Sequence, residues 1–336
     1  MVKVDLKNIL ISRTDSIGDV VLTLPMAGWL RENYPNSKIS FLARNYTAPI
    51  VALSSNIDEF ISYDELSSLP VSSQMSFLET KNIDCVLHVF PQLQISSLMK
   101  KAAIKIRVGT KNRMQHWFHC NSLVNLSRKN SDLHEAQLNF KLLQPLGLDK
   151  IPDAEKIHEW YGFIKLPLLE EKYRSLLSIE KENIILHPKS KGSAREWGLE
   201  NFSELIKHLP SEKYKIFISG SADEGKMCKD IFDMHPNVTD LTGKMNLSQF
   251  IAFINESSAI VAASTGPLHI AAALNKKAIG LFAPMRPIHP GRWSPLGKRV
   301  KVLVKEKNCE DCSKSQNCHC IREIGVHEVI SALASL

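Results

Sequence analysis

The chain has 336 residues, of which 44% are hydrophobic and 23% are charged. This length suggests two domains, and this composition is typical of a globular protein with enough apolar material for two cores. Two classes of protein are excluded, which are proteins with a membrane-spanning helix and secreted proteins with a signal peptide. No apolar run approaches the roughly 18 residues that a membrane-spanning helix needs, and residues 1–7 lack the apolar core of a signal peptide. We therefore expect a protein that stays in the cytoplasm.

The formal net charge is +7, and it is unevenly distributed along the chain. No Asp or Glu occurs between Cys85 and Ser131. The basic residues of this segment are Lys100, Lys101, Lys105, Arg107, Lys111, Arg113, Arg128 and Lys129. Such a segment favours a polyanionic partner, which would be nucleic acid, an anionic membrane face or a phosphorylated substrate. The alternative is a solvated basic face without a partner.

The first half alternates between strand and helix patterns. Residues 8–12 read as a buried strand, residues 13–19 as a loop and residues 20–34 as a helix, which is how many doubly wound α/β domains begin. The opening lacks the Gly-x-Gly-x-x-Gly motif, so a nicotinamide-dependent oxidoreductase loses its main support. Further strands are predicted at 38–43, 59–63, 84–89 and 104–108, and helices at 66–80, 93–103 and 132–146.

The second half repeats this alternation. Strands are predicted at 183–186, 215–219, 237–240, 259–263, 278–282 and 299–304, and helices at 199–209, 223–234, 247–255, 268–275 and 326–336. We expect two Rossmann-like α/β domains whose parallel sheets face a cleft, where a ligand could bind. The predicted division is a first domain at 1–160, a linker at 161–182, a second domain at 183–325 and a final helix at 326–336.

The stretch Ser264-Thr265-Gly266-Pro267-Leu268-His269 follows a predicted strand and opens a predicted helix. Ser, Thr and Gly start helices, and Pro is tolerated in the first turn because its missing N–H would have no partner there. The free amides and the positive end of the helix dipole suit a phosphate. The alternative is an ordinary strand-to-helix turn.

Asp19 lies in the first loop, where a helix begins. One interpretation is a helix cap. The other is a general base at the carboxyl end of a strand, with Gly18 giving the backbone room. Arg13, Asp15 and Ser16 in the same loop could orient an acceptor.

Two further loops follow predicted strands. Residues 186–197 carry hydroxyls and the cations Lys189, Lys191 and Arg195, which suit a diphosphate, although a basic surface loop has the same composition. Residues 219–224 include Asp223 and Glu224. A carboxylate at this place can accept hydrogen bonds from ribose hydroxyls, but Asp223 is also a good helix cap.

These motifs together resemble family 9 glycosyltransferases, the heptosyltransferases of lipopolysaccharide core assembly. The similarity rests on Asp15-x-x-Gly18-Asp19, Arg195-x-Trp197, Ser264-Thr265-Gly266-Pro267-Leu268-His269, and Arg107-Val108-Gly109-Thr110 with Arg113. The resemblance spans nearly the whole chain. It implies a GT-B fold, with the acceptor on the N-terminal domain and the nucleotide sugar on the C-terminal domain.

The resemblance also implies a mechanism. Asp19 would take the proton from the acceptor hydroxyl as it attacks ADP-heptose, in a single displacement with inversion that needs no metal or other cofactor. Lys191, Arg195 and the amides of Thr265 and Gly266 would stabilise the departing diphosphate. Glu224 would hold the ribose and Met245 would lie beside the adenine. The remaining donor-binding residues would be Ser190, Trp197, Ser264, Pro267 and His269.

On the acceptor side, the resemblance implies Arg13, Asp15, Ser16, Gly18, Arg107 and Arg113. The basic stretch would meet the phosphates and carboxylates of a lipid-linked, Kdo-bearing oligosaccharide. Two positions depart from the best-known members, since Ser264 stands where they often have Asp and Lys191 where they tend to have Thr. Both departures weaken the case for heptose specifically.

Four cysteines crowd near the C-terminus: Cys309, Cys312, Cys318 and Cys320. A Cys-x-x-Cys pair beside a second short pair is an arrangement that can hold structural zinc or iron, although the Cys-x-Cys spacing is tight for ligation by all four. Free thiols are the main alternative, and disulfides are disfavoured in a reducing cytoplasm.

Two other functions stay open. The first is a family 9 enzyme with a different donor sugar or a protein acceptor. The second is a non-catalytic protein that binds nucleotides or polyanions. We expect a cytoplasmic enzyme in peripheral contact with the inner membrane through its acid-free segment, and no nucleic acid partner.

Overall fold

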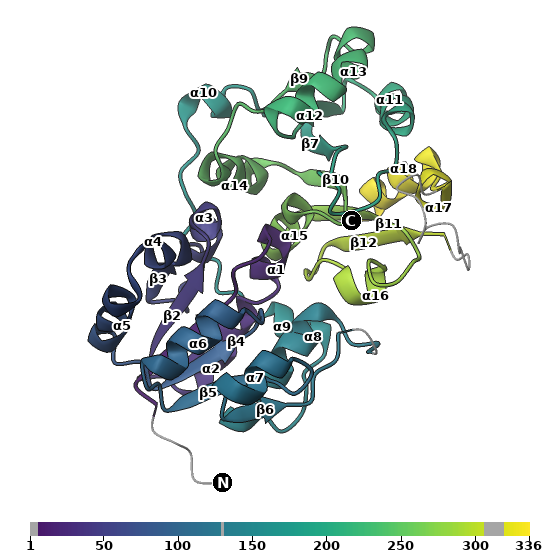
Figure 1. Ribbon diagram of the computed structural model, residues 1–336. Coiled ribbons are helices and arrows are strands. Elements are labelled where there is room, and N and C mark those ends of the chain that lie inside the picture. The colour runs from purple at the N-terminus through teal and green to yellow at the C-terminus, as the bar shows by residue number, and fades with distance from the viewer. Residues whose placement is uncertain (1–5, 129–130, 306–318) are drawn as a thin grey trace. The chain divides into compact units, whose positions relative to one another are not determined.

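A computed structural model describes residues 6–128, 131–305 and 319–336. The chain divides into two compact units, Met1–Lys165 and Leu166–Leu336, and each has its own six-stranded parallel sheet (Figure 1). The division falls within residues 161–182, where the sequence is irregular. The two units are described separately below.

The sheet of the first unit has the order β3-β2-β1-β4-β5-β6. Its strands are β1 (Asn8–Ser12), β2 (Lys38–Ala43), β3 (Glu59–Ser62), β4 (Cys85–His88), β5 (Ile106–Thr110) and β6 (Ser122–Val124). The chain builds outward from β1 on one side and then returns to add β4 on the other. The point between β1 and β4 is therefore a topological switch, where ligands of doubly wound sheets bind.

The helices of the first unit are α1 (Ile17–Val21), α2 (Pro25–Asn33), α3 (Ala48–Val51), α4 (Tyr63–Ser68), α5 (Val71–Thr80), α6 (Leu93–Lys101), α7 (Met114–His119), α8 (Glu135–Phe140) and α9 (Ala154–His158), with 3₁₀ turns η1 (Asn45–Thr47) and η2 (Lys141–Leu146).

The sheet of the second unit has the order β12-β11-β10-β7-β8-β9, so its switch point lies between β7 and β10. Its strands are β7 (Glu182–His187), β8 (Tyr214–Ile218), β9 (Thr239–Asp240), β10 (Ala259–Ala263), β11 (Lys277–Phe282) and β12 (Val300–Val304). Its helices are α10 (Glu171–Arg174), α11 (Leu199–His208), α12 (Ala222–Met227), α13 (Lys229–Met234), α14 (Leu247–Glu256), α15 (Gly266–Ala273), α16 (Pro290–Trp293), α17 (His319–Arg322) and α18 (Val326–Ser335).

Most predicted elements are present, but several predicted helices are split. The predicted helix 66–80 breaks between α4 and α5, because Leu69 precedes Pro70 and adopts an extended conformation. The predicted helix 20–34 becomes α1 and α2, with Pro25 in the first turn of α2. The predicted helix 223–234 breaks at Cys228. The sequence analysis missed the short elements α3, α7, β6, α9, α10, α16 and α17.

The core of the second unit is completed by the end of the chain. Trp197 is fully buried there, and its indole N–H donates to the carbonyl oxygen of Ile324 at 2.9 Å. The buried side chains that α17 and α18 add to this core include Cys320, Ile321, Val329 and Leu333.

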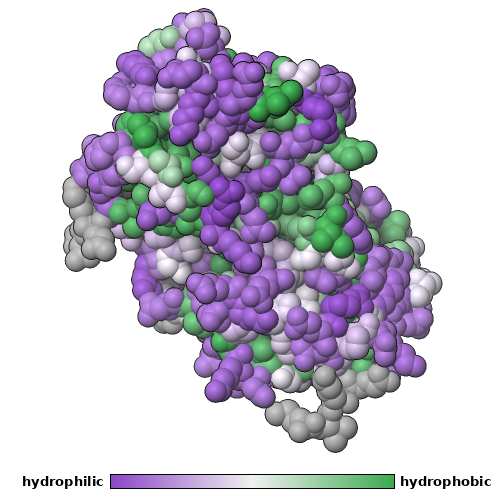
Figure 2. Space-filling view, turned by 180° about the vertical axis from the view of Figure 1, so that it is seen from behind, coloured by the Kyte–Doolittle hydropathy of each residue, from purple (hydrophilic) through white to green (hydrophobic). Residues whose placement is uncertain are grey.

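Polar side chains cover most of the face seen in Figure 2, and hydrophobic ones form separate patches between them. Among the described residues, no helix has the length and hydropathy required to cross a membrane.

Candidate functional site

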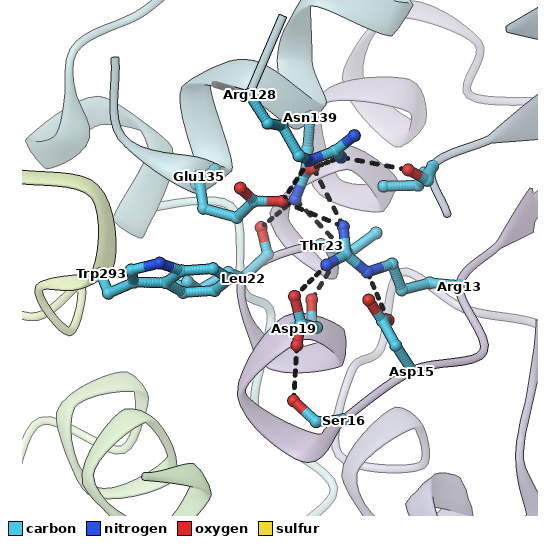
Figure 3. A network of polar contacts seen from close by, with 12 residues as sticks. Arg13, Asp15, Ser16, Asp19, Leu22, Thr23, Arg128, Glu135, Asn139 and Trp293 are labelled. Atoms are coloured by element: carbon cyan, nitrogen blue, oxygen red, sulfur yellow. Dashed lines mark hydrogen bonds and ion pairs between the residues drawn. The ribbon is translucent and has the colours of Figure 1, made fainter. Parts of the chain in front are cut away.

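In the first unit, the predicted base Asp19 is the third residue of α1, which follows the carboxyl end of β1 at the switch point. Its side chain is about 16% exposed. One carboxylate oxygen accepts from the Arg13 guanidinium and the other accepts from the Ser16 hydroxyl (Figure 3). Because a carboxylate has about four acceptor positions, Asp19 retains capacity to accept a proton from a bound hydroxyl.

Arg13 lies at the centre of this network, and its guanidinium is almost completely buried. Besides Asp19, it donates to Asp15 at 2.6 Å and to Glu135 at 3.2 Å. Burial alone would lower the pKa of Arg13, but the three surrounding carboxylates hold it above its ordinary value. Arg13 is therefore a permanent cation beside Asp19.

Asp15 responds differently to the same surroundings. Burial, together with the neighbouring charge of Asp19, raises the pKa of Asp15 from its usual 3.8 to about 6, although Arg13 opposes the shift.

A second layer of the network comes from α8, which is far away in sequence (Figure 3). Glu135 is completely buried and accepts from both Arg13 and Arg128, the latter at 2.8 Å. Asn139, one turn further along the same face, accepts from both guanidiniums, at 3.3 and 3.1 Å. Its amide group donates to Leu22 O and to the Thr23 hydroxyl, both at 3.2 Å.

This second layer also supports the backbone that carries Asp19. The Thr23 hydroxyl donates to the carbonyl oxygen of Asp19 at 2.8 Å, and the amide of Asn139 holds Thr23 in turn. The sequence analysis did not identify Glu135 or Asn139. The available signal was two polar residues four apart in a segment with apolar neighbours, on what becomes the buried face of α8.

The other predicted acceptor residues lie near β5. Arg107 directs its guanidinium toward the main-chain carbonyls of His119 and Ile104, so in this structure it braces the connection around β5. Arg113 is exposed and precedes α7. Gly18 lies inside α1 beside Asp19. β4 separates β5 from β1 in the sheet, and both strands run toward the same edge.

In the second unit, three predicted clusters leave adjacent strands at one edge of the sheet. The loop 188–197 follows β7, residues 219–224 follow β8, and Ser264 to His269 follow β10. Since β10, β7 and β8 are neighbours and parallel, their carboxyl ends lie side by side.

The first two clusters line one pocket of about 460 Å³. Its lining includes Lys191, Gly192, Glu196, Asp223 and Glu224. Glu224 also caps α12, because one of its carboxylate oxygens accepts from the Ser221 amide at 2.7 Å and from the Ser221 hydroxyl at 2.9 Å. The cap interpretation of this segment is thus correct, with Ser221 and Glu224 in place of Asp223.

The residues predicted to bind the donor from the loop after β7 differ in their surroundings, and Ser190 holds the loop in place. The Ser190 hydroxyl donates to Ala194 O at 3.0 Å, and its amide donates to Glu196 at 3.0 Å. Lys191 is exposed and adopts a left-handed conformation with φ of 49°. Arg195 is half-buried. The prediction that the side chain of Trp197 contacts the donor is corrected, because this side chain is fully buried in the core.

Thr265 precedes α15, whose first two residues are Gly266 and Pro267. The Thr265 hydroxyl is buried and has no hydrogen-bond partner among the described residues, and His269 is 3% exposed in the first turn of the helix. The first amides of a helix have no partner within it, so this end retains donors for an anion. Ser264 and Met245 are both half-buried.

The proposed metal site lies largely outside the described residues, since Cys309, Cys312 and Cys318 are not among them. Cys320 packs into the core of the second unit. Within the described ranges, no three His, Cys, Asp or Glu side chains are grouped as metal ligands would be.

Comparisons with known proteins match this arrangement to one family. The model of glycosyltransferase family 9 (heptosyltransferase) matches residues 74–320. Lipopolysaccharide heptosyltransferase 3 of Escherichia coli is 23% identical over 285 residues, which are 79% of each chain. Lipopolysaccharide core heptosyltransferase OpsX of Haemophilus influenzae is 24% identical over 90% of this chain and 86% of its own.

Among solved structures, the E. coli ADP-heptose lipopolysaccharide heptosyltransferase II covers 98% of both chains with a TM-score of 0.76 and 20% identity. At this identity the likeness concerns the fold, and it confirms the predicted GT-B fold with two Rossmann-like domains.

The first prediction concerns Glu135. Glu135→Gln removes a buried charge that two guanidiniums share, and we expect it to lower the free energy of unfolding by about 3 kcal/mol. The matched control is Glu59→Gln, because Glu59 also contacts two cations, Lys38 and Lys81, but in a partly exposed position. The control should cost less than about 1 kcal/mol. Urea unfolding followed by circular dichroism measures both, and equal losses would contradict a structural role for the buried network.

The second prediction concerns pH. Because the folded-state pKa of Asp15 lies near 6 and its usual value is 3.8, the folded protein binds the extra proton between these values. The contribution of Asp15 to stability therefore falls as pH rises from about 4 to 6 and stays constant above. Asp15→Asn mimics the protonated form, so its stability relative to wild type should rise across this range. A pH-independent difference between the two proteins would show that Asp15 does not titrate there.

Proposed function

Since the model of glycosyltransferase family 9 covers most of the chain, the protein belongs to this family, and we propose that it transfers heptose from ADP-heptose to an inner-core lipopolysaccharide acceptor. The family makes the protein a glycosyltransferase. The donor and the acceptor are inferred from the relatives, which are named for ADP-heptose and for lipopolysaccharide. The single observation that carries the catalytic assignment is Asp19, held at the switch point of the first sheet with part of its carboxylate exposed.

In the proposed reaction, Asp19 accepts the proton of the acceptor hydroxyl as the oxygen attacks the anomeric carbon. The bond from this carbon to ADP breaks in the same step, and the configuration inverts. One carboxylate base suffices, and no covalent intermediate or metal is required. Arg13 and Ser16 hold the two oxygens of Asp19, so the base is oriented before the acceptor arrives. Arg13, Asp15, Ser16, Gly18, Arg107 and Arg113 are the proposed acceptor-side residues, in a domain that spans 1–160.

The second unit, through a domain that spans 183–325, is proposed to hold the nucleotide sugar. The amides at the start of α15, together with Lys191 and Arg195, would stabilise the negative charge that develops on the departing diphosphate. The second carboxylate oxygen of Glu224 would accept from a ribose hydroxyl, since only one oxygen serves as the helix cap. The other proposed donor contacts are Ser190, Met245, Ser264, Thr265, Gly266, Pro267 and His269.

The enzyme is proposed to work in the cytoplasm at the inner membrane, in peripheral contact with the lipid that carries the acceptor. We assign no role in catalysis to the cysteine-rich segment.

The donor is tested by calorimetry with ADP, UDP and GDP, each with and without EDTA. Selective binding of ADP that EDTA does not change is the expected result. A preference for UDP or GDP would keep the fold and the family but point to a different donor sugar, consistent with the uncharged Ser264. Absence of binding to all three would favour a protein that does not use a nucleotide sugar.

The base is tested by Asp19→Asn, which retains the shape of the side chain and an oxygen that accepts from Arg13. We expect turnover to fall roughly 10²–10⁴-fold, the usual contribution of a general base, while ADP affinity stays unchanged. Asp230→Asn, at an exposed position in the second unit, is the control and should leave both quantities unchanged. Near-normal turnover in Asp19→Asn would mean that the base is another residue.

A further inference from the structure

The short helix α7 exposes three large apolar side chains on one face. Met114, Trp117 and Phe118 are 70%, 61% and 63% exposed. They occupy positions i, i+3 and i+4 of the helix and therefore point in the same direction. Isolated apolar residues are common on protein surfaces, but a grouped set that includes two aromatic rings marks an interaction site.

The opposite face of α7 is fixed against the sheet. His116 is fully buried, and its Nδ1 accepts from the Thr110 amide at 2.9 Å. A Cβ atom on Gly109 would lie 2.5 Å from this nitrogen and 2.7 Å from Cys120 Sγ, so only glycine allows this close approach. The Trp117 indole N–H donates to Lys111 O at 2.6 Å. These contacts fix the inner face of α7 against β5, so the two rings on its other face point outward.

Exposed basic residues precede α7 along the chain, and one of them contacts it. α6 lies beside α7 (Figure 1), and the ammonium group of Lys100, near its end, donates to Phe118 O at 2.8 Å. The exposed basic residues around the helix are Lys100, Lys101, Lys105, Lys111 and Arg113. Since residues 85–131 contain no Asp or Glu, this positive charge is not balanced within the segment.

We propose that the α7 surface, made of Met114, Trp117 and Phe118 with the surrounding lysines, docks onto an anionic lipid bilayer. Apolar and aromatic side chains that enter the headgroup region, surrounded by lysines that meet anionic headgroups, are the features of an interfacial membrane helix. A single-stranded nucleic acid would use the rings for stacking, but Met114 has no ring and is the most exposed of the three.

This inference rests on the proposed function in one respect, which is that a lipid-linked acceptor lies in such a bilayer. α7 begins where β5 ends, at the edge of the sheet toward which β1 also runs. Docking through α7 would therefore bring the first unit, which carries Asp19, to the lipid surface.

The first test is co-sedimentation of the full chain with vesicles made of equal parts phosphatidylcholine and phosphatidylglycerol. The double variant Trp117→Ser/Phe118→Ser should bind these vesicles at least roughly tenfold more weakly than wild type. The matched control is Leu69→Ser/Val71→Ser, which removes two exposed apolar side chains elsewhere in the first unit and should bind like wild type. Equal affinity of both double variants would overturn the proposal.

The charge requirement is tested on the same vesicles. Lys101→Gln and Lys111→Gln should each weaken binding about fivefold, whereas Lys150→Gln, exposed in the same unit but outside the segment, should not. Pure phosphatidylcholine vesicles should bind weakly. Equal binding to both kinds of vesicle would overturn the electrostatic part.

Fluorescence locates the contact directly. Brominated lipids should quench tryptophan emission in wild type and lose this effect in Trp117→Phe. Unquenched emission would reject the lipid assignment. Binding of the double variant to single-stranded RNA is measured as well, and loss of RNA binding without loss of vesicle binding would also reject it.

Turnover on a delipidated acceptor separates this inference from the proposed function. The double variant should keep wild-type turnover there, because it removes only membrane contacts. If neither protein turns over, the proposed function fails, while the vesicle results still decide the role of α7.

Discussion

One buried cation fixes the loop after β1 and the helix that carries Asp19. Arg13 lies at the end of the central strand, where desolvation of a guanidinium is expensive unless its donors are satisfied. Asp15, Asp19 and Glu135 satisfy them from three directions. The same contacts that compensate for burial of Arg13 also fix the loop and the first helix. Asp19 is thus oriented by the interaction that makes the loop stable.

Both units follow the same plan despite their different sequences. Each sheet starts at its centre, extends to one side and then returns to the other, so that the loops after neighbouring strands meet at one edge. In the second unit this plan gathers hydroxyls, cations and helix amides from three separate stretches of sequence. In the first unit it gathers carboxylates and guanidiniums. The chemistry differs, but the position at the switch point is the same.

The sequence predicted well those features that depend on local pattern. Strands such as 38–43 and 259–263 were found with their observed bounds. The second is a continuous apolar run, which is how a parallel strand buried on both faces reads. Helix α7 was missed, since its six residues are too few to establish a period and its apolar face points to water. The side chains that contact the Asp19 carboxylate, Arg13 and Ser16, lie within six residues of it in the sequence, but Glu135 lies 122 residues from Arg13. Their pairing is a tertiary contact that one sequence does not reveal. The placement of Trp197 failed for a related reason, because a motif residue can support a loop from inside the core.

The order of the elements along the chain has a consequence for synthesis on the ribosome. The first unit contains all of its strands by Val124 and ends at Lys165, so its sheet can form while the rest is being translated. The second unit cannot be completed so early, because α17 and α18 supply part of its core and Trp197 bonds to Ile324. Its apolar interior stays open until α17 and α18 emerge. During translation, the nascent chain therefore consists of a finished first unit followed by a second unit that still exposes surface on which chaperones act.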